Sequence, residues 1–206
     1  MTNPVLPLFA AGQETAQARP RLPRNFYARP TLQVARDLLG QRLVRVLNGE
    51  RVGGRIVETE AYVGEADKAN HAARGWRERH AVMYGPPGHA YVYLIYGVHH
   101  ALNAVTESEG FPAAVLIRAI APDEGLAVLR ARRGGRPDAE LTNGPGKLCQ
   151  ALGIDLGLNG VDLTESPDLF IEADVAVDET QVKRTPRVGV GGDDRAKSAL
   201  WRFVLQ

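Results

Sequence analysis

Alternation of apolar and polar residues predicts that most of the chain forms β-strands. The stretch "QRLVRVLNGERVGGRIVETEAY", which begins at residue 41, alternates on both sides of Asn48-Gly49, a dipeptide typical of two-residue hairpin turns. The stretches "YVYLIYG" and "HHALNAVT" predict a second pair of strands with Gly97 near its turn, and "AAVLIRAI" predicts an apolar strand. Shorter strands are expected at "DLFIEA", "TPRVGVG" and "LWRFVLQ".

The helical segments are few and short. Thr31 is a candidate N-cap for "TLQVARDLL", which Gly40 would end, and Asp123 and Asn143 are candidate caps for "EGLAVLRARR" and "GPGKLCQAL". Antiparallel strands with a few short helices indicate a single α+β domain over residues 26–206. Residues 1–25 are rich in Pro, Ala and Arg without any periodicity, and we expect a mobile tail there.

Composition narrows the class of protein. A chain of 206 residues with 44% apolar content is long enough for one domain with a substantial core. Its single cysteine, Cys149, excludes an internal disulfide and fits a reducing compartment. Since there is no apolar run of bilayer-spanning length and no signal-peptide pattern, we expect an intracellular, cytoplasmic protein that does not bind membranes.

The charges are segregated along the chain although the net charge is only +1. Five arginines and no acid lie between Glu14 and Asp37, further basic clusters follow at 130–136 and 183–187, and the run from Asp162 to Glu179 is acidic only. Two interpretations stay open: a basic face that meets a polyanion, or solvated charges that cluster by chance.

One strand carries unusual chemistry. In "GRIVETEAYVG", the side chains of Glu58, Glu60 and Tyr62 share a face by the two-residue strand period. On a solvated face two carboxylates are ordinary, whereas in a cleft one of them could act as a general base. The strand period alone does not choose between Glu58 and Glu60.

The stretch "AYVYLIYGVHHALN" is the second unusual segment. Tyr91 and Tyr93 share one face, and Tyr96 has the other parity and lies beside Gly97 near the predicted turn. An aromatic side chain at a hairpin tip has little to pack against, and it could act as a wedge between stacked bases. The alternative is a buried strand whose tyrosines fill the core.

We predict no metal ion and no cofactor. The histidines are scattered, and no cysteine or carboxylate completes a recognisable ligand set with them. In "TNGPGKLCQAL", a glycine-rich helix start precedes Lys147 and could receive a phosphate, although a plain capped helix is the simpler interpretation.

Several of these blocks together resemble a known family. The stretches "GRIVETEAYVGEADKANHA", "YVYLIYGVHHALN", "VLIRAIAP", "NGPGKLCQALGI" and "RVGVG" resemble, in order, the alkyladenine (3-methyladenine or methylpurine) DNA glycosylases. The resemblance runs from about residue 26 to the C-terminus and is loose over 72–90 and 155–183. It implies a compact α+β fold with a curved antiparallel sheet and a protruding β-hairpin that enters the DNA minor groove.

The resemblance also assigns roles to matching positions. It implies that Glu60 is the general base and that Arg118 and the carbonyl of Val188 help it to hold the attacking water. Tyr62, His71 and Tyr93 match residues that stack on and contact the flipped base, Asn103 matches a residue that excludes guanine, and Tyr96 matches the inserted aromatic. Met83, Val98 and Lys147 are candidate DNA contacts.

The implied activity is that of a monofunctional DNA glycosylase of base excision repair. Alkylated or deaminated purines (3-methyladenine, 7-methylguanine, hypoxanthine) would be flipped out of duplex DNA, and a Glu-activated water would leave an abasic site. The resemblance places no lysine beside Glu60 to form a Schiff base. We expect a monomer whose partner is damaged double-stranded DNA, nucleoid-associated in a bacterium. The alternatives are a non-catalytic damaged-DNA-binding module and a hydrolase of free nucleosides or RNA.

Overall fold

The computed structural model describes residues 19–95 and 97–206. The strands are β1 (Arg42–Leu47), β2 (Glu50–Val63), β3 (Ala90–Ile95), β4 (His99–Val105), β5 (Ala113–Glu124), β6 (Leu169–Glu172), β7 (Val182–Thr185) and β8 (Arg202–Leu205). The α-helices are α1 (Arg24–Tyr27), α2 (Thr31–Asp37), α3 (Leu126–Arg132), α4 (Pro145–Leu152) and α5 (Asp194–Ser198). Short 3-10 helices are η1 (His71–Arg74), η2 (Glu78–Tyr84), η3 (Asp138–Glu140), η4 (Leu156–Leu158) and η5 (Glu179–Gln181).

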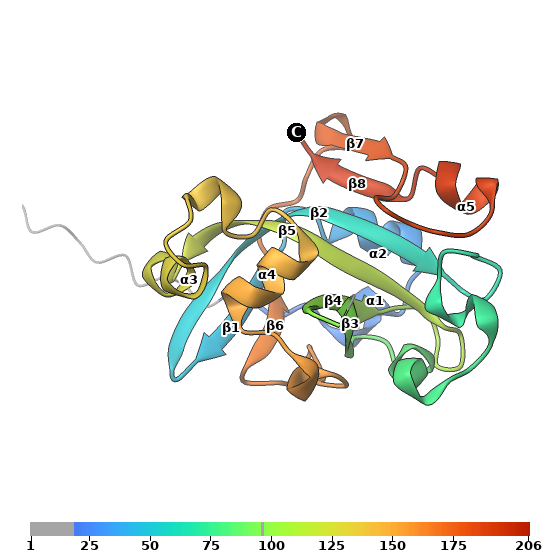
Figure 1. The fold of residues 1–206 in the computed structure, drawn as a ribbon, viewed down its shortest axis with the longest axis horizontal. Coiled ribbons are helices and arrows are strands. Elements are labelled where there is room, and N and C mark those ends of the chain that lie inside the picture. The colour runs from blue at the N-terminus through green and yellow to red at the C-terminus, as the bar shows by residue number, and fades with distance from the viewer. Residues whose placement is uncertain (1–18, 96) are drawn as a thin grey trace, which may run out of the picture.

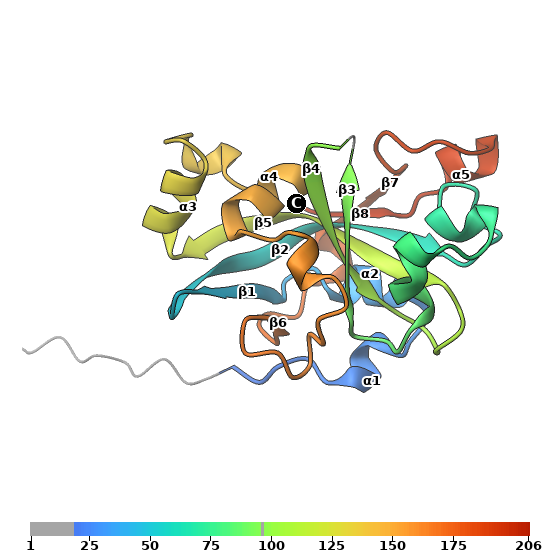
Figure 2. The same cartoon turned by 60° about the horizontal axis from the view of Figure 1, so that its bottom comes forward.

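The strands form one antiparallel sheet, which confirms the predicted α+β class. Its order is β3-β4-β5-β2-β1-β6, and β8 pairs with both β2 and β7. The long strands β2 and β5 run side by side through the molecule, with α3 near one end and β7, β8 and α5 near the other (Figure 1). The β3–β4 hairpin crosses the sheet, with α3 and α4 to one side and α5 to the other (Figure 2).

The hairpin of β1 and β2 forms as the sequence predicts. Leu47 pairs with Glu50, so that Asn48 and Gly49 make a two-residue loop. Both loop residues have positive φ, 52° at Asn48 and 84° at Gly49. Such a loop matches the right-handed twist of its strands, and asparagine and glycine tolerate this backbone best.

The pairing of β2 with β5 is irregular at the centre of the sheet. Thr59 pairs with Ile117 and Glu58 pairs with Ala119, which leaves Arg118 as an extra residue on β5. Val57 on β2 is likewise skipped, because the next pair is Ile56 with Ile120. Irregularities of this kind interrupt the hydrogen-bond ladder between two strands and change the direction of nearby side chains. Here they lie next to the residues of the site described below.

The core lies between the sheet and the helices packed on it. Its largest fully buried side chains include Tyr27, Leu38, Ile56, Leu102, Ile117, Leu148 and Phe203. They come from α1, α4, the strands and the residues after α2, so that segments distant in the sequence share one apolar cluster. None of the described helices has the length and apolar character needed to cross a membrane.

The three predicted helix caps are wrong. The N-caps are Pro30, Gly125 and Gly144, and none of them provides a side-chain cap. The Thr31 hydroxyl instead donates to Glu107 over 2.8 Å, and Asn143 accepts from Lys147 over 2.8 Å. The strand expected at "TPRVGVG" is also wrong beyond Thr185, where β7 ends.

The N-terminal residues that the structure describes are attached to the domain. The backbone N–H of Leu22 donates to Ile171 on β6 over 2.8 Å, and the Leu22 side chain is buried. Arg21 forms an isolated bridge with Glu172. Residues 20–22, part of the stretch expected to be a tail, therefore pack along β6 and Ala173, and residues 1–18 lie outside the described residues.

Most of the segregated charges neutralise each other in the fold. Arginines of the N-terminal basic run pair with the acidic run 162–179: Arg19 with Asp174, Arg24 with Asp162, and Arg36 with Glu179. Arg184 also pairs with Glu179, and Arg130 pairs with Asp138. Arg132 and Arg133 of the second cluster bond only to the neutral Gln150, so the interpretation as a basic face stays a prediction.

Candidate active site

Glu60 is a fully buried carboxylate near the C-terminal end of β2, with an exposed fraction of 0%. Its Oε1 accepts a hydrogen bond from the backbone N–H of Val188 at 2.7 Å and lies 3.2 Å from Nη1 of Arg118. Its Oε2 accepts from the Tyr62 hydroxyl at 2.8 Å. A carboxylate offers about four lone-pair directions, so these three donors leave room for one more, such as a water.

A cavity of about 900 Å³ lies directly beside this carboxylate. Tyr62, Arg118 and Val188, the three residues that hold Glu60, all line it. The remaining walls come from β3, β4, β5, the 3-10 helices η1 and η2, and the loop 188–191, with Asn103, Leu116, Arg79 and Pro145 among their lining residues. The buried carboxylate therefore stands behind the wall of a cavity large enough for a nucleotide.

One wall of the cavity is aromatic. The ring of His71 meets that of Tyr93 edge-on, with 4.5 Å between ring centroids, and Tyr91 and Tyr93 are 5.4 Å apart. Nδ1 of His71 and the Tyr91 hydroxyl share a hydrogen bond of 2.8 Å. Burial, and then the nearby charges of His80 and Arg79, lower the pKa of His71, so that its ring is neutral at physiological pH. The wall is therefore a neutral, apolar platform suited to a flat ring system.

Two asparagines organise this wall. Asn70 caps η1 by accepting from the N–H of Ala72, and its Nδ2 donates to the carbonyls of Gly64 and Pro112 at 3.0 Å each. It thereby fixes where the neighbouring His71 begins the helix. Asn103 is 3% exposed and donates from Nδ2 to the Tyr91 carbonyl over 3.0 Å, which holds its amide against the cavity.

A buried ion pair anchors the loop that carries Val188. Both nitrogens of the Arg187 fork donate to Asp67, at 2.6 and 2.8 Å, and they also donate to the carbonyls of Ala61 and Ala196. The guanidinium lies 4.7 Å from the Tyr62 ring centroid and 4.9 Å from that of Trp201. Arg187 therefore ties the loop 188–191 to β2 and supports the Tyr62 ring at the same time.

The structure brings most of the predicted site residues together around one cavity. Tyr62, His71, Met83, Tyr93, Asn103, Arg118 and Val188 all line it, and Glu60 lies immediately behind. Val188 contacts Glu60 through its backbone N–H, and the role of its carbonyl toward the attacking water stays a prediction. Met83 is only 2% exposed, packs with Tyr91, Val105 and Ala114, and lines the cavity, so that its contact with DNA stays a prediction.

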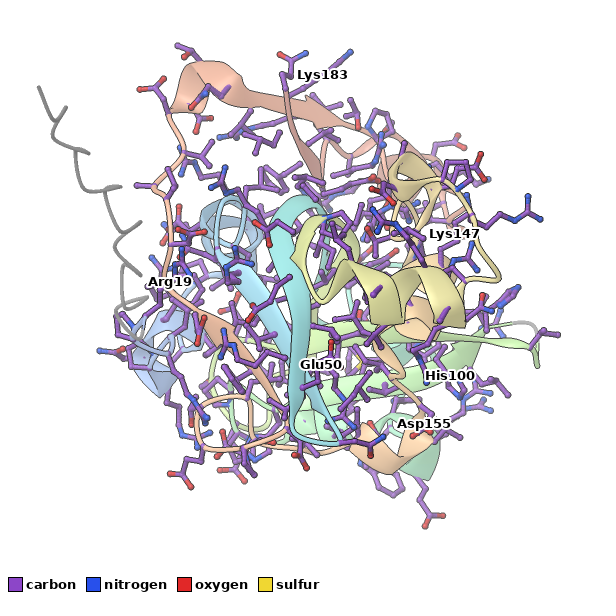
Figure 3. The ribbon with its side chains drawn as sticks, turned by 90° about the vertical axis from the view of Figure 1, so that its left-hand side faces the viewer. Arg19, Glu50, His100, Lys147, Asp155 and Lys183 are labelled. Atoms are coloured by element: carbon purple, nitrogen blue, oxygen red, sulfur yellow. The ribbon has the colours of Figure 1, made fainter. Side chains whose placement is uncertain are left out.

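Of the three other predicted DNA-contacting residues, Val98 and Lys147 lie away from the cavity, and Tyr96 is not described by the structure. Val98, 71% exposed, sits at the turn of the β3–β4 hairpin, and Tyr96 lies outside the described residues. Lys147 on α4 is on the same side of the molecule as His100 of β4 (Figure 3), and α4 packs against β4. Neither Val98 nor Lys147 lines the cavity.

The described residues contain no group of three or more His, Cys, Asp or Glu side chains placed to hold a metal ion. Cys149 is buried, and this burial raises the pKa of its thiol to about 12. A thiol held in that state is neither a ready nucleophile nor a metal ligand, because both roles need the thiolate.

Several important residues were not recognised from the sequence. Tyr91 shares a strand face with Tyr93, which was a usable signal for a common role. Asn70 directly precedes a short helix, which is a capping signal. Nothing local could reveal that Arg187 pairs with Asp67, since 120 residues separate them.

Comparison with known proteins agrees with this geometry. A model of the methylpurine-DNA glycosylase family matches residues 25–206. A protein of Methanocella arvoryzae named "Putative 3-methyladenine DNA glycosylase" is 54% identical over 187 residues, which cover 89% of this chain and 92% of that protein. A protein of the same name from Carboxydothermus hydrogenoformans is 49% identical over 185 residues, 90% and 95% of the two chains.

The comparisons identify the class of the protein as DNA glycosylases, hydrolases that cleave N-glycosyl bonds in DNA repair. The chain belongs to the methylpurine-DNA glycosylase family.

Proposed function

We propose that this glycosylase turns alkylated or deaminated purine nucleotides out of duplex DNA into the 900 Å³ cavity and hydrolyses the N-glycosidic bond with a water activated by Glu60. The observation that carries the proposal is the placement of Glu60. It is fully buried, yet all three groups that hold it line an aromatic cavity. A base inside the cavity and a carboxylate at its wall are what this chemistry requires.

The aromatic wall supports the recognition of the base. Stacking on aromatic side chains contributes about 1–3 kcal/mol per base, and Tyr62, His71 and Tyr93 offer such surfaces. Cationic purines such as 3-methyladenine and 7-methylguanine gain a further attraction to the faces of the tyrosine rings. Asn103, held by the Tyr91 carbonyl, would crowd the exocyclic amino group of guanine.

The carboxylate of Glu60 would act on the sugar of the flipped nucleotide. Cleavage develops positive charge on the sugar, which the anion of Glu60 stabilises. As water adds to C1′ its proton passes to Glu60, while the bonding electron pair leaves with the purine. A methylated cationic purine departs as a neutral molecule, so it needs no separate acid. Arg118 and the Val188 N–H hold Glu60 in place for this transfer.

Free cations beside the cavity support duplex DNA as the partner. Arg74, Arg77 and Arg79 are exposed, and within the described part of the chain their side chains make no hydrogen bond or ion pair. Trp76 in the same loop is 61% exposed. Arg79 also lines the cavity, so this loop sets positive charge where phosphates beside a flipped nucleotide would lie. On this proposal Tyr96 at the turn of the β3–β4 hairpin fills the gap in the duplex, and Lys147 and Val98 contact its backbone.

The product would be an abasic site. Among the described residues no lysine lines the cavity, so no amine is placed to form a Schiff base with the sugar. We therefore infer a monofunctional enzyme, and one copy of the chain carries every group used in this proposal, which is compatible with a monomer.

The test uses duplex oligonucleotides that carry hypoxanthine, 7-methylguanine or 3-methyladenine, followed by alkali to cut abasic sites. The wild-type protein should release at least one of these bases, and Glu60→Gln should bind the same duplex yet lose excision. Equal excision by Glu60→Gln and wild type would contradict the role of Glu60. Binding without excision by the wild type would indicate a damaged-DNA-binding module, and a covalent adduct trapped with borohydride would contradict the monofunctional mechanism.

A further inference from the structure

Arg118 is shared between two carboxylates of β2. Its Nε donates to Oε1 of Glu58 over 2.6 Å, while its Nη1 lies 3.2 Å from Oε1 of Glu60. The same Oε1 of Glu58 also accepts from Nε of Arg202 over 2.6 Å. The carboxylate of Glu58 therefore holds two guanidinium groups, and one of them is the group that reaches Glu60.

We propose that Glu58 is a positioning residue which, together with Arg202, keeps Arg118 shared and so sets how readily Glu60 takes the proton of the attacking water. The inference rests on the proposed function of Glu60 as the base. Glu58 does not line the cavity, and it acts only through Arg118.

The irregular pairing of the sheet makes this arrangement possible. Arg118 is the extra residue of β5, placed between the pairs Thr59–Ile117 and Glu58–Ala119. Its backbone thus lies opposite the junction of Glu58 and Thr59, and its side chain reaches both Glu58 and Glu60. From the other edge of β2, β8 brings Arg202 into register with Glu60, and Arg202 donates to Thr185 of β7 over 3.1 Å.

The chemistry of the arginine fork explains why sharing matters. A guanidinium has five N–H donors and forms its strongest pairs with a single carboxylate when two parallel hydrogen bonds are available. While Nε is engaged by Glu58, Arg118 offers Glu60 only its Nη1 side. If Glu58 lost its charge, the fork could turn fully toward Glu60 and occupy the lone pair that the water needs.

The charges around the two glutamates also support the sharing of Arg118 between Glu58 and Glu60. Burial raises the pKa of Glu58, but hydrogen bonds from Arg202 and Arg118 outweigh it, so that the pKa lies below its usual range and Glu58 is ionised at neutral pH. Two carboxylates thus face two guanidiniums. The groups that face the pair from neighbouring elements are Arg118 on β5, Arg202 on β8, Tyr62 on β2, the Val188 N–H of the following loop, and Arg187 behind the Tyr62 ring.

The experiment measures how the rate of single-turnover excision depends on pH. It compares a variant that lacks one of the negative charges with a variant that lacks one of the positive charges. Glu58→Gln removes a negative charge without a change in shape, which favours the ionised form of Glu60. Its rate should fall at least tenfold, with unchanged affinity for the duplex, and the acid limb of its profile should move to lower pH by about one unit. Arg202→Gln removes a positive charge, so that its acid limb should move to higher pH. Glu58→Asp keeps the charge and should keep the acid limb of the wild type.

Glu124→Gln is the matched control, because Glu124 pairs with Arg51 at the far end of β5 and β2. It should leave rate and profile unchanged, and thermal melting checks that every variant is folded. Opposite shifts for Glu58→Gln and Arg202→Gln support the proposal, since damage to the fold would not move the limb in two directions. Rate loss without any shift, or a Glu58→Gln protein identical to wild type, would overturn it. If the wild type itself released no base, the proposed function would be the part that fails.

Discussion

The hydroxyl of Tyr62 donates a hydrogen bond to Oε2 of Glu60 over 2.8 Å, while the ring of the same tyrosine lines the cavity. Burial, and then the charge of Glu60, raises the pKa of Tyr62 well above its usual value. The phenol therefore stays protonated and remains a donor throughout the neutral range. A single side chain thus joins the surface that receives a base to the carboxylate proposed to act on its sugar.

The first prediction concerns Tyr62→Phe, which keeps the ring and removes only this donor. A hydrogen bond to a charged group contributes about 1.5–3 kcal/mol, so we expect the single-turnover excision rate to fall at least tenfold while affinity for the duplex changes little. Tyr84→Phe is the matched control, because the Tyr84 hydroxyl donates to Glu65 over 3.0 Å away from Glu60. Equal losses for the two variants would contradict a specific role for the Tyr62 hydroxyl.

The second prediction concerns the Arg187–Asp67 pair. Both side chains are almost fully buried, so Asp67→Asn leaves an uncompensated charge inside the protein. We expect the free energy of unfolding to fall by about 3–5 kcal/mol, measured by urea denaturation. Arg130→Gln breaks the exposed pair with Asp138 and should leave the denaturation midpoint where it is. A comparable loss in Arg130→Gln would show that burial does not determine the effect.

The third prediction concerns His80. The side chain is fully buried, and neither ring nitrogen has a hydrogen-bond partner among the described residues. Burial, and then the charges of Arg79 and Arg77, lower its pKa. Below about pH 6.5 the unfolded chain therefore binds a proton that the folded protein resists, and stability falls as the pH drops through this region.

His80→Leu removes this proton uptake and the unsatisfied nitrogens together. Its melting temperature should decline less than that of the wild type between pH 7 and pH 5, and at pH 5 it should equal or exceed the wild-type value. His99→Gln, at the exposed start of β4, should follow the wild-type curve. Parallel curves for His80→Leu and wild type would refute the prediction.

The fourth prediction concerns the arginines beside the cavity. Replacement of Arg74, Arg77 and Arg79 by alanine should weaken duplex binding and reduce the slope of log affinity against log salt by about 0.9 for each phosphate that is no longer neutralised. Fluorescence anisotropy over a range of salt concentrations measures both. The control changes Arg130, Arg132 and Arg133, which are already engaged by Asp138 and Gln150. If the slope fell as much in the control as in the test variant, intramolecular pairing would not be what separates the two groups.

The strands were predictable because their signals are local. Alternation identified β1 to β4, a continuous apolar run identified β5, and the Asn48-Gly49 turn followed from the backbone that these residues tolerate. The helix caps were not predictable in this way. The hydroxyl of Thr31 bonds to Glu107, 76 residues further along the chain, and this partner competes with the local cap. The ion pairs of the charge clusters were not predictable either, because the acids that pair with Arg19, Arg24 and Arg36 come from distant segments.

The sequence by itself determined the class of fold, the face that Glu58, Glu60 and Tyr62 share, and the family, because the strand period and long motif blocks are properties of neighbouring residues. Only the tertiary structure decided which glutamate is the buried one, with 0% of the Glu60 side chain exposed against 15% for Glu58. That difference depends on β8, on the extra residue in β5 and on the loop that Arg187 ties down. Depth and electrostatic partners arise when segments far apart in the chain are packed together, and no local pattern records them.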